Sequence, residues 1–295
     1  MASSSVSVIV PVFADLGGLE RCLAALDRQT WSGAYEVVVV DNGGNDALDD
    51  VVARHAHARL VVESRVGSYA ARNAGIAVAS GDVLAFTDAD CIPDPDWVAA
   101  GVERLLEGNE DRVVAGDIRL AAPPGPRPTG VELHDRLTAL RQREFAERRG
   151  FGATANLFAR ASAFERVGRF DAGLRSGGDV EWAGRAAAAG IDFVFEETAR
   201  VAHAARSSLR EFSRRKARIA GGRYVLMRRE GSRTQLLRML LASVVPPVNA
   251  MIAVGTDPRL DGFGQRVRVA AVEGYLRYLE AWEMLRLALG GTPRR

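Results

Sequence analysis

Short runs of β-branched residues alternate with segments of helical periodicity along the first 120 residues of the chain. Repeated β–α units of this length predict an α/β fold, with a mostly parallel sheet and helices on both of its faces. The pattern places strands at 6–12, 36–40, 59–63, 82–87 and 112–120, and helices around 19–26, 46–55, 68–79 and 95–106.

A proline-rich segment interrupts this alternation. Residues 121–130 contain four prolines, which cannot continue a helix or a central strand, and they therefore predict a surface connector. After the connector, the pattern predicts helices at 131–148, 161–167 and 179–189, an extended segment at 151–159, and strands at 193–196 and 200–203.

Composition narrows the classes of function. The net charge of +2 gives the chain as a whole no attraction to nucleic acid. Lys216 is the only lysine among 39 basic residues, so a single arginine carries little weight. Cys22 and Cys91 lack metal-ligand spacing and predict reduced core thiols. No secretory signal pattern opens the sequence, and we expect a cytoplasmic protein.

Two carboxylates follow the apolar strand at 82–87. Alternation along an extended segment would point Asp88 and Asp90 the same way, towards one divalent ion or one ribose–diphosphate group. Ligands of open α/β sheets bind at this end of the strands. A solvated acidic turn is the alternative interpretation, so the motif alone does not decide.

Two other strand ends offer ligand-binding candidates. Pro11 has no N–H to give to a ladder, which suits a strand end that opens towards a ligand. Asp41 leaves the second strand and can accept a hydrogen bond from a nucleobase, while Gly43 and Gly44 permit close approach of the backbone. An ordinary Asn-Gly turn is the alternative for this second segment.

Three further segments supply candidates for acid–base and metal chemistry. Ser68 is placed to cap a helix, with Arg72 one turn inside it and within reach of a nucleotide. Asp179 follows a glycine-rich turn and is either a helix N-cap or a general base for an acceptor hydroxyl. His203 ends a short strand and is either structural or a third ligand of a divalent ion.

Together these segments resemble the family 2 glycosyltransferases, which have a GT-A type, Rossmann-like fold. The resemblance runs from residue 6 to about residue 233. It implies that residues 1–120 bind a nucleotide sugar, 121–205 bind the acceptor and catalyse, and 206–295 form a helical extension. The motifs that carry it are SVIVPVF, VVVVDNGGND, GSYAARNAGIAVASGDVLAFTDADC, FGATANLFAR, VGRFD, GGDVEW and VAH.

The resemblance implies a donor site at the ends of the first strands. Asp41 would hold the nucleobase, the backbone of Pro11 and Val12 would line the nucleoside, and Asp88 would approach the ribose. The complete set of implied donor-binding residues is Pro11, Val12, Asp41, Arg72, Asp88 and Ala89.

Metal-dependent, inverting transfer is the chemistry that the resemblance implies. Asp90, with His203 and Asp88, would hold Mn²⁺ or Mg²⁺, which would offset the charge of the leaving diphosphate. Asp179 matches the second position of the Glu-Asp motif that supplies the base in this family, and would deprotonate the acceptor hydroxyl. At the first position this chain has Gly178 in place of Glu.

The resemblance also implies partners. We expect a nucleotide-sugar donor, a UDP-sugar by family habit, and a glycan, lipid-linked or small-molecule acceptor near Asn156 and Glu181. The Gln-x-x-Arg-Trp motif of processive synthases is missing, so transfer of one sugar per encounter is expected. The alternatives are a non-catalytic binder of the same fold and a sugar-1-phosphate nucleotidyltransferase, although loop 13–18 has an acid and no base for a triphosphate.

The C-terminal segment leaves two interpretations open. Residues 206–233 hold ten basic residues and two acidic ones, residues 236–254 are apolar but interrupted, and 264–289 has an aromatic, amphipathic helical pattern. These features fit peripheral contact with the inner face of a membrane. The plainer interpretation, favoured on the sequence alone, is a helical subdomain that packs on the core or on a second subunit in a homo-oligomer.

Overall fold

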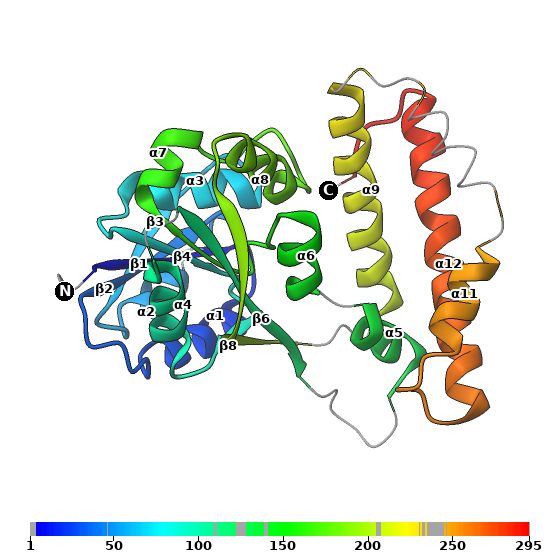
Figure 1. Ribbon diagram of the computed structural model, residues 1–295, viewed down its shortest axis with the longest axis horizontal. Helices are drawn as coiled ribbons and strands as arrows, with labels where there is room; N and C mark the ends of the chain where they lie inside the picture. The colour runs from blue at the N-terminus through cyan, green and yellow to red at the C-terminus, as the bar shows by residue number, and fades with distance from the viewer. Residues whose placement is uncertain are drawn as a thin grey trace. The chain divides into compact units, whose positions relative to one another are not determined.

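The computed structural model describes residues 4–294, except 46, 109–110, 122–127, 139–140, 205–207, 230, 232–233, 235–244 and 246. Most of the predicted connector and the first half of the apolar segment 236–254 lie outside the described residues. The chain forms two compact units (Figure 1). The sheet unit comprises residues 1–119, 140–173 and 178–203, and the helical unit comprises 120–139, 174–177 and 204–295.

One eight-stranded sheet, in the order β3-β2-β1-β4-β7-β6-β8-β5, organises the sheet unit. Its parallel strands are β1 (Val6–Val12), β2 (Tyr35–Asp41), β3 (Ala58–Val62) and β4 (Val83–Thr87). The others are β5 (Cys91–Pro93), β6 (Arg112–Ala121), β7 (Asn156–Arg160) and β8 (Asp192–Ala204). β7 runs antiparallel to β4 and β6, and β5 runs antiparallel to β8.

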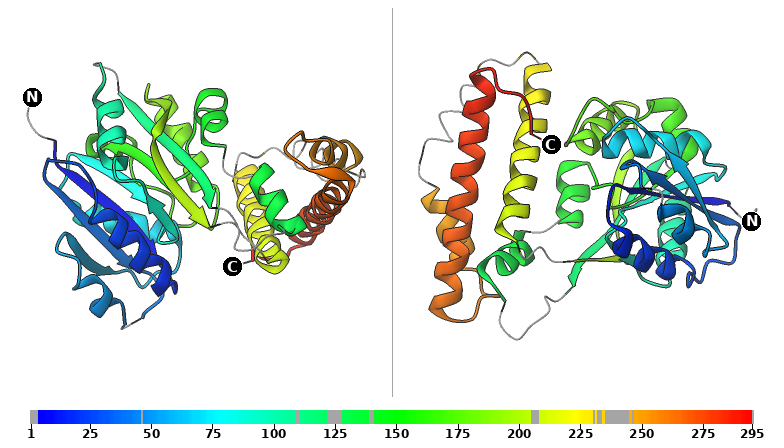
Figure 2. Two further views of the ribbon diagram at one scale, coloured as in Figure 1. Left: turned by 90° about the horizontal axis from the view of Figure 1, so that it is seen from below. Right: turned by 180° about the vertical axis from the view of Figure 1, so that it is seen from behind.

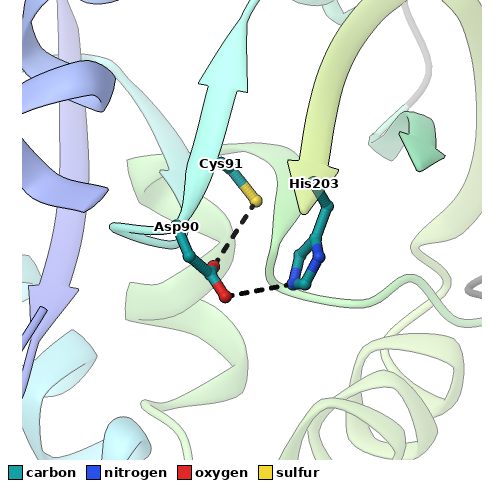
Figure 3. A group of neighbouring side chains, drawn as sticks. All are labelled: Asp90, Cys91 and His203. Carbon is teal, nitrogen blue, oxygen red and sulfur yellow. Dashed lines mark hydrogen bonds and ion pairs between the residues drawn. The ribbon is translucent and has the colours of Figure 1, made fainter. Parts of the chain in front are cut away.

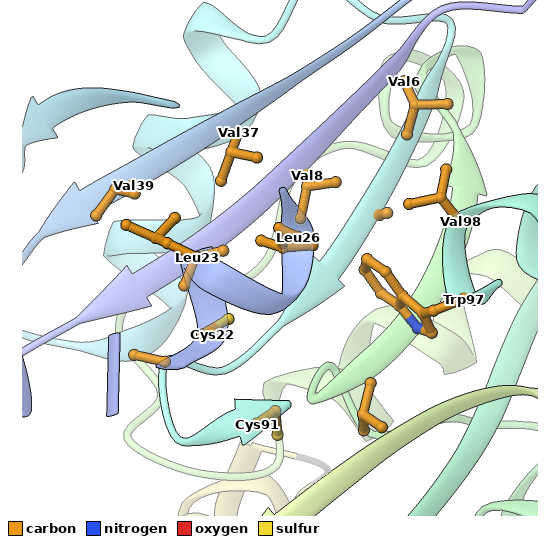
Figure 4. Packing of buried hydrophobic residues seen from close by; sticks show 14 of the residues in the cluster. Val6, Val8, Cys22, Leu23, Leu26, Val37, Val39, Cys91, Trp97 and Val98 are labelled. Carbon is orange, nitrogen blue, oxygen red and sulfur yellow. The ribbon is translucent and has the colours of Figure 1, made fainter. Parts of the chain in front are cut away.

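Helices cover both faces of this sheet because side chains alternate along each strand. Val8 and its even-numbered neighbours in β1 pack with α1 (Leu16–Leu26), α2 (Ala47–Val52) and α4 (Trp97–Leu106), as Figure 4 shows in part. Ile9 faces the opposite side, which α3 (Ser68–Val78) covers. The helix lies so close to the sheet there that a Cβ on Gly75 would come within 2.6 Å of the Ile9 side chain.

An aromatic cluster on that second face holds α8 (Gly178–Ala188) in place. Trp182 of α8 stacks on Phe164 of α7 (Ala161–Val167) at 4.5 Å between centroids, and Phe170 lies edge-on to Phe86 of β4. Trp182 Nε1 also donates to the Gly168 carbonyl at 2.8 Å. The N-terminus of α8, which carries Asp179, is therefore anchored to the sheet.

The helical unit contains α5 (Gly130–Thr138), α9 (Leu209–Arg229), α11 (Val248–Gly255) and α12 (Gly262–Ala288), with α12 packed against the other three (Figure 2). Its interior holds charge. His134 Nε2 lies 2.7 Å from Glu273 Oε2, and Arg277 Nε donates to Oε1 at 2.7 Å. Within the described residues, no helix combines the length and apolarity that crossing a bilayer requires.

The predicted α/β fold with helices on both faces of the sheet is confirmed, and several local expectations are wrong. β8 runs unbroken through residues 192–204, where two short strands were expected, because a strand tolerates the exposed Glu197 and Thr198. β5, of only three residues, is too short for a periodicity to predict. Ser68 does not cap α3, whose N-cap is Gly67 without a side-chain hydrogen bond. The remaining helix, α6 (Gln142–Arg149), lies in the sheet unit.

Candidate functional site

A tight turn follows β4 and separates the two carboxylates of the Asp-x-Asp motif. The Cys91 N–H donates to the Asp88 carbonyl at 3.0 Å, which closes a turn through Ala89 and Asp90. The prediction that Asp88 and Asp90 point the same way along an extended segment is therefore wrong. Asp88 forms an ion pair with Arg72, whereas Asp90 approaches His203.

Pairing of β5 with β8 places His203 beside Asp90, although the two residues lie far apart in the sequence. β5 and β8 are antiparallel, and Cys91 lies directly opposite His203 in their register. His203 Nε2 is 3.2 Å from Asp90 Oδ2, and Cys91 Sγ is 3.9 Å from Asp90 Oδ1 (Figure 3). One ligand atom from each of these three residues lies within 4.8 Å of the other two.

Asp90 and His203 together suit a divalent cation. A half-exposed carboxylate beside a buried imidazole offers the oxygen and nitrogen donors that Mn²⁺ accepts, and leaves positions for further oxygen ligands. Cys91 does not suit the same ion. Burial, and then the charges of Asp88 and Asp90, raise the pKa of its thiol well above the usual range, and a protonated thiol is a poor ligand. Cys22 and Cys91 are free and buried, as the sequence predicts.

Arg72 is a buried cation on α3 that faces Asp88. Only 4% of its surface is exposed, and Asp88 accepts a hydrogen bond from its Nη2. Its Nε–H is buried without a hydrogen-bond partner in the described part of the chain. A buried, unpaired donor is costly, and a ligand oxygen would satisfy it.

Tyr69, one helical turn before Arg72, links this group to Asp179. The Tyr69 hydroxyl donates to Asp179 Oδ1 at 3.2 Å, and the Arg72 guanidinium lies 5.8 Å from the Tyr69 ring centroid. Burial raises the pKa of Asp179 above its usual range, and the Val180 N–H and the charge of Arg72 act against this rise. Tyr69 was not among the candidates expected from the sequence, although its i, i+3 spacing from Arg72 places both on one face of the helix.

Tyr69 also accounts for Gly178. A Cβ on Gly178 would lie 2.7 Å from Tyr69 Cε2, which is closer than carbon atoms approach. The tyrosine ring therefore fills the space that a side chain at position 178 would need. Gly178 stands where the resemblance led us to expect Glu, and the Tyr69 ring as placed leaves no room for that side chain.

Asp41 closes its own loop. Its carboxylate accepts the backbone N–H groups of Gly43 at 2.8 Å, Gly44 at 3.0 Å and Asn45 at 3.0 Å. These hydrogen bonds fix the loop that follows β2. A carboxylate has about four lone-pair directions, so three donors leave one for a ligand. Gly43 is required, because a Cβ there would lie 1.7 Å from the Phe13 carbonyl oxygen.

The remaining sequence candidates lie around these groups. Pro11 is partly exposed near the end of β1, and the carbonyl of the buried Val12 accepts the Asn42 N–H at 2.8 Å. Ala89 is buried in the turn before β5. Glu181 forms an ion pair with Arg185 at 2.7 Å, one turn along α8.

Asn156 does not face an acceptor, contrary to the expectation from the sequence. It is fully buried, its Oδ1 accepts from Trp97 Nε1, and its Nδ2 donates to the carbonyls of Asp117 and Ala199. Each of its polar side-chain atoms is thus used to join β6, β7, β8 and α4. We assign Asn156 a structural role.

The sequence is similar to known glycosyltransferases. The family model described as glycosyl transferase family 2 matches residues 7–168. The glycosyltransferase AglE of Haloferax volcanii is 38% identical over 207 residues, which cover 68% of this chain and 67% of that protein. The pre-mycofactocin glycosyltransferase of Mycobacterium tuberculosis is 30% identical over 236 residues, and the match covers 78% of this chain but only 49% of that relative.

Solved structures share the fold. A mannosyltransferase of Pyrobaculum calidifontis in complex with GDP-Man and Mn²⁺ has a TM-score of 0.60 at 20% identity, covering 97% of this chain and 76% of its own. Glucosyl-3-phosphoglycerate synthase of Mycobacterium tuberculosis has a TM-score of 0.54 at 23% identity, covering 78% and 81% respectively. At these identities the likeness concerns the fold.

Proposed function

The chain belongs to glycosyl transferase family 2, and on this premise we propose that it is a metal-dependent, inverting transferase of single sugars. The donor would be a nucleotide diphosphate sugar, a UDP-sugar first among them, and the acceptor a hydroxyl of a glycan, lipid-linked or small molecule. The observation that carries the proposal is the grouping of Asp90 with His203, Asp88 with Arg72, and Asp179 with Tyr69 in one unit.

Asp90 and His203 would hold Mn²⁺ or Mg²⁺, with Asp88 on the donor side of the ion. When bound, the cation offsets the negative charge that grows on the departing diphosphate. The solved mannosyltransferase of similar fold is in complex with GDP-Man and Mn²⁺, which supports this choice of ion. Arg72 would donate a hydrogen bond from its unpaired Nε–H to an oxygen of the nucleotide sugar. It would also hold Asp88 towards the ribose.

The nucleoside would lie at the ends of β1 and β2. Asp41 keeps one acceptor direction for an N–H of the base, and the backbone of Pro11, Val12 and Ala89 would line the nucleoside and ribose. The tight Gly43 loop lets the backbone approach the ligand closely.

Asp179 would act as the general base. It would take the proton of the acceptor hydroxyl as that oxygen attacks the anomeric carbon from the face opposite the diphosphate. A carboxylate whose pKa is raised by burial is a better proton acceptor near neutral pH than an exposed one. Tyr69 would orient the carboxylate through its hydrogen bond.

Turnover of a panel of UDP-, GDP- and dTDP-sugars, with Mn²⁺ and then with EDTA, tests the proposal. We expect release of the nucleoside diphosphate that EDTA stops and that Asp90→Ala reduces by about a hundredfold or more. Glu165→Gln on the exposed surface of α7 serves as the matched control. Activity that survives both EDTA and Asp90→Ala would remove the metal from the mechanism. Donor binding without any turnover would favour the non-catalytic binder, and synthesis of a nucleotide sugar from a triphosphate would favour the nucleotidyltransferase.

A further inference from the structure

Helix α12 is apolar on two opposite faces. One face is buried in the helical unit, where it contributes Val269, Leu276, Met284 and Leu287. The other face is exposed. Large side chains that are 44–82% exposed follow this face and the C-cap residue Leu289, and we call them the apolar stripe: Phe263, Val267, Tyr275, Tyr278, Trp282, Leu285 and Leu289.

The stripe is continuous along the helix. Its members follow one another at intervals of three or four residues, except across Ala271, and such intervals keep side chains on one face. At 1.5 Å per residue the stripe is about 39 Å long. Val248 and Ile252 of α11 widen it, because they line a hollow of about 350 Å³ together with Val267. The hydroxyl of Tyr275 lies 3.1 Å from Ser213 Oγ on α9.

Charge divides the molecule sharply. The helical unit has 21 arginine and lysine residues and nine aspartate and glutamate residues, a net charge of +12. The sheet unit has 18 and 28, a net charge of −10. The net charge of the whole chain is therefore near zero although the helical unit is strongly basic. Exposed arginines such as Arg210, Arg214 and Arg218 follow one row of α9.

These two features select the partner of the stripe. A second copy of the chain would bring two units of +12 together, which repels, whereas an anionic bilayer attracts a basic unit. Tyrosine and tryptophan, which have apolar rings and a polar atom, are enriched where protein meets the headgroup region. We propose that the helical unit binds peripherally to an anionic membrane, with the apolar stripe of α12 inserted at the interface.

Flotation with vesicles tests the surface without any use of catalysis, so it stands apart from the proposed transferase activity. We expect the protein to float with phosphatidylcholine–phosphatidylglycerol vesicles at low salt, and to float much less with phosphatidylcholine alone or at high salt. Tyr278→Ser with Trp282→Ser should weaken binding by about tenfold or more. Val62→Ser with Val66→Ser, two exposed apolar positions in the sheet unit, should leave it unchanged.

Trp282 gives a second readout on the unaltered protein. Trp97 and Trp182 are buried and Trp31 is partly buried, whereas Trp282 is 58% exposed, so vesicles should shift the tryptophan emission to shorter wavelength. The shift should be absent in Trp282→Phe, which keeps an aromatic side chain in the stripe and should still float. Flotation that the stripe variants leave unchanged would overturn insertion of the stripe. Failure to float at low salt, together with a dimer that is absent in the double variant Tyr278→Ser, Trp282→Ser, would assign the stripe to a second copy.

Discussion

The sheet unit and the helical unit distribute polar and apolar groups in opposite ways. The sheet unit buries valine, leucine and aromatic side chains on both faces of its sheet, and its candidate site residues lie at the ends of strands and on α3 and α8. The helical unit buries the charged pair of His134 and Glu273 and exposes the aromatic residues of α12. The sheet unit thus keeps its interior apolar, whereas the helical unit buries charge and exposes an apolar stripe on an otherwise basic surface.

The largest effect that separates the two units is expected from Asp179→Asn. Removal of the base should lower the turnover number by about a thousandfold, because proton transfer from the acceptor contributes on this scale. Steady-state kinetics gives the turnover number, calorimetry gives donor affinity, and thermal melting gives stability. Donor affinity and stability should remain close to those of the unaltered protein. If donor affinity falls as far as turnover does, Asp179 is a helix cap or a binding residue and not the base.

His134→Ala should show the reverse pattern. The substitution leaves Glu273 buried with Arg277 as its remaining ion-pair partner, and should destabilise the protein by about 3 kcal/mol. Urea unfolding measures this loss, and the turnover number of the folded fraction should not change. His57→Ala, on the exposed surface of the sheet unit, is the control and should cost less than about 1 kcal/mol. Equal losses from the two variants would show that the buried pair contributes little.

Acid should act on the helical unit through Glu273. Hydrogen bonds from His134 and Arg277 outweigh burial and lower the pKa of Glu273 to about 2. A carboxyl group whose pKa is lower in the folded state stabilises the fold above the ordinary pKa of the group, and this stability is lost as pH falls towards 2. Thermal melts of the unaltered protein and Glu273→Gln should therefore differ most near neutral pH and converge between pH 4.5 and about 2. A difference that is constant over this range would contradict the assignment.

The smallest effect concerns Tyr69→Phe. Loss of the hydroxyl that donates to Asp179 removes one of the contacts that lower the pKa of this carboxylate, so its pKa should rise. Because a base must be ionised, the acid limb of the pH–activity profile should move to higher pH, with about a tenfold loss of turnover on its acid side. Tyr35→Phe, which removes a hydroxyl that donates to the Leu26 carbonyl, is the control. An unmoved acid limb would leave Tyr69 as a packing residue only.

The sheet unit was easier to predict from the sequence than the helical unit, because the two differ in what they bury. Period-two and helical patterns sufficed for the α/β core, since burial on both faces leaves a strong signal in each strand. Asp90 and His203 were named as partners from the sequence, and they lie together, although their role as metal ligands stays a prediction. The directions of Asp88 and Asp90 were missed because a hydrogen-bonded turn, and not an extended segment, joins them.

Contacts between distant segments were beyond the reach of sequence patterns. Nothing local predicts that Tyr69 packs against Gly178, or that His134, to which no role was assigned, lies beside Glu273. In α12 the apolar periodicity was visible, but not which of its two apolar faces is buried. The packing of α5, α9 and α11 on α12 leaves the apolar stripe exposed and so identifies the outward face.

The register between β5 and β8 has a consequence for how the protein is made. Asp90 meets His203 only after β8, far along the chain, has paired with the three residues of β5. Contacts between such distant segments form slowly, because the loop between them must close first. Before β8 has been synthesised, a nascent chain can already pair β1, β2, β3 and β4. It then has no imidazole beside Asp90. If Asp90 and His203 hold Mn²⁺ as proposed, affinity for the ion should therefore arise as a late step of folding, after the parallel core has formed.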